Sequence, residues 1–96
     1  MCKLNFVSNA RINLWVDDDK DPIELSPHQF PGLISEALSN VTQDKLILAV
    51  TIFTKQTYTD YVLAIITTWD GIMPCRALYK LFANGKYDTV GKVDYL

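Results

Sequence analysis

Two strongly apolar runs separated by a short polar segment constrain this chain more than any other feature of its sequence. The run Leu46–Phe53 is apolar except for Thr51, and the run Tyr61–Trp69 has a similar composition. Both are rich in β-branched residues, and runs of this length are typical of interior strands covered on both faces. The link of residues 54–60 is short, so we expect these two strands to be antiparallel neighbours.

A helix is predicted just before these strands. Ser26 is suited to start it, Pro27 fits the first helical position, and Gln29 completes a capping box with Ser26. Pro31 should distort the first turns or move the start to Pro31 itself, and Asn40 is a suitable end. The apolar residues at helical spacing are Phe30, Leu33, Ile34, Ala37 and Leu38.

The N-terminal region alternates between polar and apolar residues, which indicates half-buried strands at residues 3–7 and 11–16. Ser8 and Asn9 between them suit a turn, so the pattern predicts an opening hairpin. If the apolar residues of the second strand face inward, Trp15 faces outward, where it marks a contact site or a second covering layer. The inward set is Ile12, Leu14 and Val16.

Residues 74–84 allow two interpretations. The segment has good helix formers such as Ala77 and Leu78 and contains no β-branched residue, and Gly85 can cap a helix there. Asn84-Gly85 is also a strong hairpin signal, which would join residues 78–82 to residues 87–90 as strands. We favour the helix, followed by a closing strand over residues 87–95.

Composition favours one folded domain over residues 1–96. The chain is 49% hydrophobic and 21% charged, and no linker or repeat divides it. Strands and helices in mixed order with short links predict an α+β fold. We expect two layers, with an antiparallel sheet of about four to five strands and one or two helices packed on a face.

The sequence also favours a cytoplasmic location. We expect no secretory signal at the N-terminus, and no apolar run approaches the roughly 20 residues that span a bilayer. Cys2 and Cys75 are expected to be reduced thiols, as is usual in the cytosol. Two cysteines and one histidine at unrelated spacings predict no metal site, and nothing indicates a cofactor.

Signatures of catalysis are weak, so we expect a protein that is not an enzyme. The four glycines are scattered and form no phosphate loop. His28 has no partner in the sequence pattern, although a dyad with Cys75 is conceivable. Cys75 beside Arg76 at a helix start could be a reactive thiol or simply a small buried residue. Carboxylates at loop or strand ends are the other candidates: Asp60, Asp70, Asp88 and Asp94.

An acidic cluster and nearby aromatic residues are the best candidates for a contact surface. The acidic cluster consists of Asp17, Asp18, Asp19, Asp21 and Glu24. It has two interpretations: a patch that docks on a basic surface of a partner, or a solvated loop. A divalent-cation loop is disfavoured because the EF-hand pattern is missing. The net charge of −2 disfavours direct binding of nucleic acid. The candidate residues are Trp15, Asp17, Asp18, Asp19, Asp21, Glu24, Tyr58 and Tyr61.

These observations together predict a small non-catalytic cytoplasmic protein that binds another protein with a basic surface. An inhibitor, immunity factor or adaptor of a phage or other mobile element has this profile. The alternative is a homo-oligomeric structural module, such as a homodimer, that pairs through an edge strand at residues 87–95. The third option is a small enzyme that uses Cys75 or the loop carboxylates.

Overall fold

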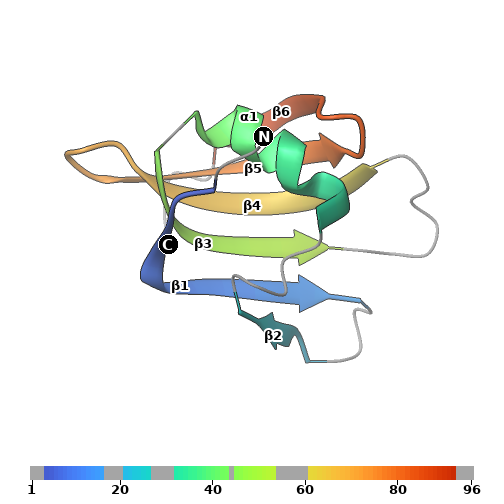
Figure 1. The fold of residues 1–96 in the computed structure, drawn as a ribbon, viewed down its shortest axis with the longest axis horizontal. Coiled ribbons are helices and arrows are strands. Elements are labelled where there is room, and N and C mark those ends of the chain that lie inside the picture. Colours follow the sequence, from blue (N-terminus) through green and yellow to red (C-terminus); the bar gives the residue numbers. More distant parts are fainter. Residues whose placement is uncertain (1–3, 17–20, 27–31, 44, 54–60, 93–96) are drawn as a thin grey trace.

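A computed structural model describes residues 4–16, 21–26, 32–43, 45–53 and 61–92 of the chain. These residues form six strands, one short 3-10 helix and one α-helix (Figure 1). In chain order they are β1 (Phe6–Trp15), β2 (Ile23–Leu25), η2 (Gly32–Ile34), α1 (Ser35–Thr42), β3 (Leu46–Phe53), β4 (Tyr61–Trp69), β5 (Pro74–Phe82) and β6 (Tyr87–Lys92).

The strands form one sheet in the order β2-β1-β3-β4-β5-β6. The pair β3 and β4 is antiparallel, as the short link between the two apolar runs predicts. β1 and β3 are parallel, and the chain passes through β2 and α1 between them. Parallel neighbours need such a crossover. The prediction of an antiparallel sheet of about four to five strands is therefore wrong in two respects. The sheet has six strands, and one pair of neighbours, β1 and β3, is parallel.

The predicted opening hairpin is also wrong. Ser8 and Asn9 lie inside β1, which runs as one strand from Phe6 to Trp15. The register against β3 shifts between Phe6 and Arg11, so this stretch contains an irregularity and not a turn. The polar dipeptide is exposed there. Local alternation detected the strand character, but it could not reveal that β1 pairs with a strand about thirty residues further on.

Residues 74–84 form a strand and a turn, not the predicted helix. All nine residues of β5 pair with β4 in an unbroken antiparallel register. The hairpin signal proves decisive: Gly85 has a φ of 88°, and the Phe82 N–H donates to the Lys86 carbonyl at 2.9 Å. Hydrogen bonding to the edge of β4 outweighs helix propensity, which differs by only a few tenths of a kcal/mol per residue among these side chains.

The helix α1 begins later than the sequence predicts. Ser26 is exposed, and the rest of the proposed capping box lies at residues 27–31, outside the described residues. The helix follows η2 directly and continues two residues beyond Asn40 to Thr42. Gln43 then adopts a left-handed conformation (φ 47°), and its N–H donates to the Ser39 carbonyl at 3.0 Å. This αL residue ends the helix without a glycine.

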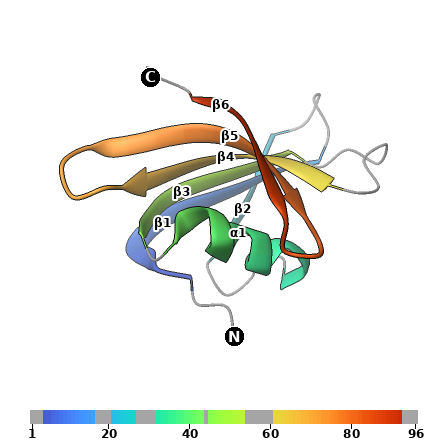
Figure 2. The same ribbon diagram turned by 90° about the horizontal axis from the view of Figure 1, so that it is seen from above.

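The core lies between α1 and one face of the sheet, which gives two layers (Figure 2). From the helix side, Ala37 and Leu38 are fully buried. Full burial of an aliphatic side chain stabilises the fold by about 1.5–3 kcal/mol, so this layer contributes much of the stability. The sheet residues in the core are Ile47, Val50, Ile52, Ala64, Ile66 and Leu81.

The opposite face of the sheet, called the open face below, has no described helix on it. Along β4 the residues alternate between buried and half-buried, with Ala64 and Ile66 buried and Leu63 and Ile65 half-buried. The prediction that the apolar strands are covered on both faces is therefore wrong for the described part of the chain. The layer architecture leaves an apolar sheet face partly accessible.

Candidate functional site

Four aromatic side chains lie side by side at one end of the open face, on β1, β3, β4 and β5. Trp15 stacks on Phe53, with ring centroids 6.5 Å apart and an interplanar angle of 26°. Tyr61 is opposite Phe82 in the register, and their centroids are 5.7 Å apart. Lys80 Nζ lies 4.9 Å from the centre of the Tyr61 ring. We call Trp15, Phe53, Tyr61 and Phe82 the aromatic row; all four are half-buried.

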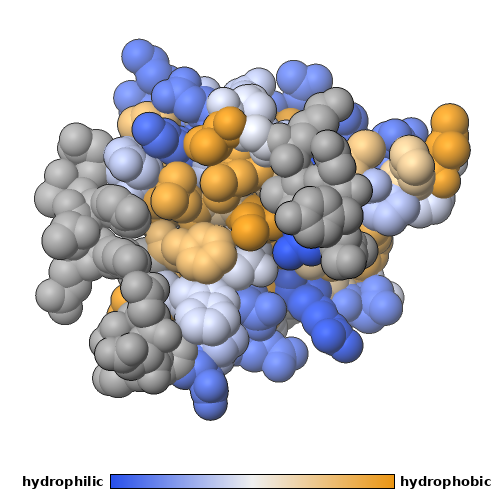
Figure 3. Space-filling view, turned by 180° about the vertical axis from the view of Figure 1, so that it is seen from behind, coloured by the Kyte–Doolittle hydropathy of each residue, from blue (hydrophilic) through white to orange (hydrophobic). Residues whose placement is uncertain are grey.

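Aliphatic side chains continue this surface across the middle of the sheet. Ile65 is directly opposite Thr51 on β3 and Leu78 on β5, so the three share one face. Leu63 joins them from the same strand, and all four side chains are half-buried. Figure 3 shows hydrophobic atoms gathered in the centre of this face, with hydrophilic atoms around them. The open face thus has an apolar centre and a polar rim.

Charged residues lie along both sides of the open face. Glu24 on β2 pairs with Asn13 of β1 and is exposed on this face. On β5, Arg76 is opposite Thr67, and Lys80 is opposite Leu63. The buried Arg76 Nε has no hydrogen-bond partner within the described structure. Exposed Arg11 of β1 lies on the same face beside the β2 edge, and exposed Asp88 of β6 is opposite Lys80, so both sides of the open face carry charges of both signs.

The structure brings together part of the predicted contact set. Trp15 and Tyr61 lie in the aromatic row, and Glu24 lies on the same face at its edge. Asp21 is exposed just before β2. The other predicted residues, Asp17, Asp18, Asp19 and Tyr58, lie outside the described residues.

Sequence reasoning did not select Phe53, which is the stacking partner of Trp15. Its run is apolar except for Thr51, and such a composition hides the alternation between a buried and an accessible face. The predicted helix over residues 74–84 includes Phe82 and gives no reason to place it beside Tyr61. A strand assignment for residues 74–82 would have revealed the row, because residues two apart share one face of a strand.

Cys75 and Asp70 are neighbours, as a thiol-based enzyme would require. Cys75 Sγ donates to Asp70 Oδ2 at 3.4 Å, and Cys75 is exposed. The backbone N–H groups of Met73 and Ile72 hold the pKa of Asp70 below its ordinary value, helped by the Cys75 thiol and the Lys45 charge. A general base works best with a pKa near the operating pH. The depressed carboxylate is thus a weak base, and its evident role is to hold the turn at residues 70–73.

Asp88 is the remaining sequence candidate for chemistry that lies within the described residues. Asp88 is exposed on β6, far along the chain from the Asp70 turn. Cys2, His28, Asp60 and Asp94 lie outside the described residues. Across the described ranges, no three histidine, cysteine or carboxylate side chains gather as a metal site. None of the described helices is long and apolar enough to cross a membrane.

Comparison with protein-family models, with curated proteins and with solved structures finds no match to this chain.

Proposed function

We propose that this protein works without catalysis, by binding another protein through the aromatic row and the adjoining apolar centre of the open face. The observation that carries the proposal is the aromatic row together with the adjoining apolar centre. Monomeric soluble proteins rarely expose large contiguous apolar patches unless a partner covers them.

The aromatic row has the composition of an interface hot spot. Trp and Tyr contribute a large share of binding energy at protein interfaces, and Trp15 and Tyr61 both lie in this row. Their rings are held by neighbours on adjacent strands, so little side-chain entropy is lost when a partner docks. A rigid, half-buried aromatic surface on a sheet supports binding better than the same residues on separate loops.

The charge at the rim indicates the chemistry of the partner. Glu24 and Asp21 are exposed along the β2 side, and the sequence places Asp17, Asp18 and Asp19 directly after β1. A partner with an apolar contact surface and a basic rim facing this edge would be complementary. Opposite charges at a rim mainly accelerate association and select the partner.

The test compares two tryptophans of the open face. Trp15 belongs to the aromatic row, whereas Trp69 is 38% exposed at the other end of β4. Tagged wild-type protein, Trp15→Ser and Trp69→Ser are used to capture partners from a lysate of the native host, with quantitative mass spectrometry. The protein identified is then purified and titrated against each variant by calorimetry.

We expect Trp15→Ser to lose at least about tenfold in affinity, as hot-spot truncation costs about 2 kcal/mol or more, and Trp69→Ser to bind like wild type. Tyr61→Ser serves as a second variant of the row if Trp15→Ser unfolds, as judged by circular dichroism. Equal affinity of all folded variants for the captured protein would rule out the aromatic row as the binding surface.

The second candidate function, self-association, is favoured by the position of β6. Among the described strands, β6 lies at the sheet edge and has β5 as its one neighbour. Its residues Asp88, Thr89 and Val90 are exposed, so a second copy could add its own β6. Light scattering across a wide range of protein concentration tests for self-association. A mass that rises with concentration supports it, and a constant monomer mass excludes it.

A further inference from the structure

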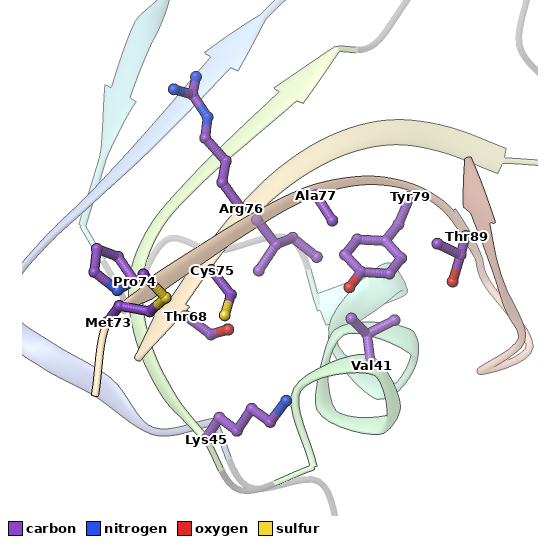
Figure 4. A pocket seen from close by; sticks show the side chains of 11 residues that line it. Val41, Lys45, Thr68, Met73, Pro74, Cys75, Arg76, Ala77, Tyr79 and Thr89 are labelled. Carbon is purple, nitrogen blue, oxygen red and sulfur yellow. The ribbon is translucent and has the colours of Figure 1, made fainter. Parts of the chain in front are cut away.

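A cavity of about 480 Å³ opens on the helix side of the sheet, between the end of α1 and strands β4, β5 and β6 (Figure 4). It lies on the opposite face from the aromatic row, at the other end of β4 and β5, so it is a separate feature. Its volume falls in the range of small-molecule sites, which are mainly apolar and contain a few convergent polar groups. The apolar walls include Val41, Ile66 and Ala77.

Thr68 supplies a buried hydroxyl to this cavity. Its side chain is only 8% exposed and points into the cavity in Figure 4. Because Thr68 lines the cavity, its hydroxyl is within reach of a ligand that enters there.

Two further donors face the same space. The Tyr79 hydroxyl points inward (Figure 4), and burial, with smaller contributions from Tyr87 and Cys75, raises the pKa of this phenol. Tyr79 therefore keeps its proton at neutral pH. Lys45 directs its amino group toward the cavity from the end of the helix.

The Lys45 charge is not neutralised by an ion pair within the described residues. Asp70 is close enough to sense this charge, but its oxygens are engaged elsewhere. Oδ1 accepts from the N–H groups of Ile72 and Met73, and Oδ2 accepts from the Cys75 thiol. An ammonium group and two hydroxyls thus converge on an otherwise apolar cavity. A carboxylate accepts hydrogen bonds and is the natural complement of such a set of donors.

We propose that this cavity binds a small monocarboxylate with an apolar body. The ligand's carboxylate accepts hydrogen bonds from Lys45, Thr68 and Tyr79, and its hydrocarbon part lies against the apolar walls. A dianion such as phosphate fits less well: the cavity presents a single cation, and the Asp70 carboxylate is near. The guanidinium of Arg76 points away from the cavity (Figure 4).

The test is a nuclear magnetic resonance titration of the isotope-labelled full chain with sodium octanoate at millimolar concentration. We expect saturable shifts of the amide signals of Thr68, Cys75, Ala77 and Tyr79, with little change in Trp15. 1-Octanol has the same apolar body without the charge, and it should bind at least about tenfold more weakly because a hydrogen bond to a charged group is lost.

Variants then identify the groups that recognise the carboxylate. Lys45→Met and Thr68→Val retain side-chain size and should each weaken octanoate binding roughly tenfold. Lys86→Met, at the exposed turn between β5 and β6, is the matched control and should bind like wild type. The proposal is overturned if octanoate shifts no cavity signals, if its shifts map to the open face, or if Lys45→Met and Thr68→Val both bind like wild type.

Discussion

The side-chain amide of Asn40 donates a 2.8 Å hydrogen bond to the carbonyl oxygen of Gly85, 45 residues further along the chain. This bond ties α1 to the turn between β5 and β6. Gly85 is buried and has a φ of 88°, which side-chain-bearing residues rarely adopt. Glu36 of the same helix lies against the glycine. The turn therefore contacts the helix in two ways: through the hydrogen bond from Asn40, and through the close approach of Glu36 to Gly85, where there is no Cβ.

Substitution Gly85→Ala should destabilise the protein by about 1–2 kcal/mol, because an L residue is strained at this φ. The added Cβ would also meet Glu36 Oε1 at 2.9 Å, although that flexible side chain can move away. Denaturant unfolding measures the change. Gly32→Ala is the control: a Cβ there meets nothing within 4 Å, and its unfolding free energy should not fall. Equal stability of the two variants would contradict the assignment of strain to Gly85.

Leu38→Ala should destabilise the fold by about 2–5 kcal/mol, because Leu38 is completely buried between α1 and the sheet and its truncation leaves a cavity. Leu46→Ala is the matched control, since Leu46 is 46% exposed and should lose clearly less. Thermal unfolding followed by circular dichroism gives both values. If the two variants lost similar stability, the helix-side core would not be the main stabilising layer.

The Asp70 turn should respond to acid. Because the folded-state pKa of Asp70 lies below its ordinary value, the carboxylate contributes stability above the unfolded-state pKa. That contribution is lost as the pH falls through the lowered folded-state pKa. In a pH titration by nuclear magnetic resonance, the amide signals of Ile72 and Met73 should shift with this low midpoint. Asp70→Asn keeps an accepting oxygen and should abolish the titration; a midpoint at or above the ordinary value would contradict the bonds described here.

The acidic cluster should affect association with the partner, not folding. Replacing Asp17, Asp18, Asp19 and Asp21 together by serine should weaken binding of the captured partner and flatten its dependence on salt. Exposed charges are screened over about 8–10 Å at physiological ionic strength. Calorimetric titrations at low and high salt measure both effects. Unchanged affinity at low salt would remove the cluster from the proposed contact surface.

The sequence predicts the central strands well because their signal is strong and local. β3 and β4 have the predicted bounds, since long β-branched runs leave little competition from helix. The helix prediction for β5 is wrong because Ala77, Leu78 and Leu81 are good helix formers, although the segment is a strand. Pairing with the edge of β4 decides the conformation of β5, and this pairing depends on the tertiary structure and not on the local sequence.

The candidate site was only partly predictable for a similar reason. Trp15 was recognised by alternation within its own strand, which requires no knowledge of its neighbours. Phe53 and Thr68 became candidates only through the faces on which their strands place them. The convergence of Lys45 with Thr68 depends on where α1 ends, which the sequence located two residues too early.

The parallel pairing of β1 with β3 also sets an order of assembly during synthesis. The strands β3, β4, β5 and β6 are neighbours both in the sheet and along the chain. Each of them can therefore pair with the strand before it as soon as it has been made. β1 reaches β3 only across β2 and α1, and closing that longer loop costs more chain entropy. While the chain emerges from the ribosome, its first long strand therefore has only the three-residue β2 as a partner until β3 has been translated.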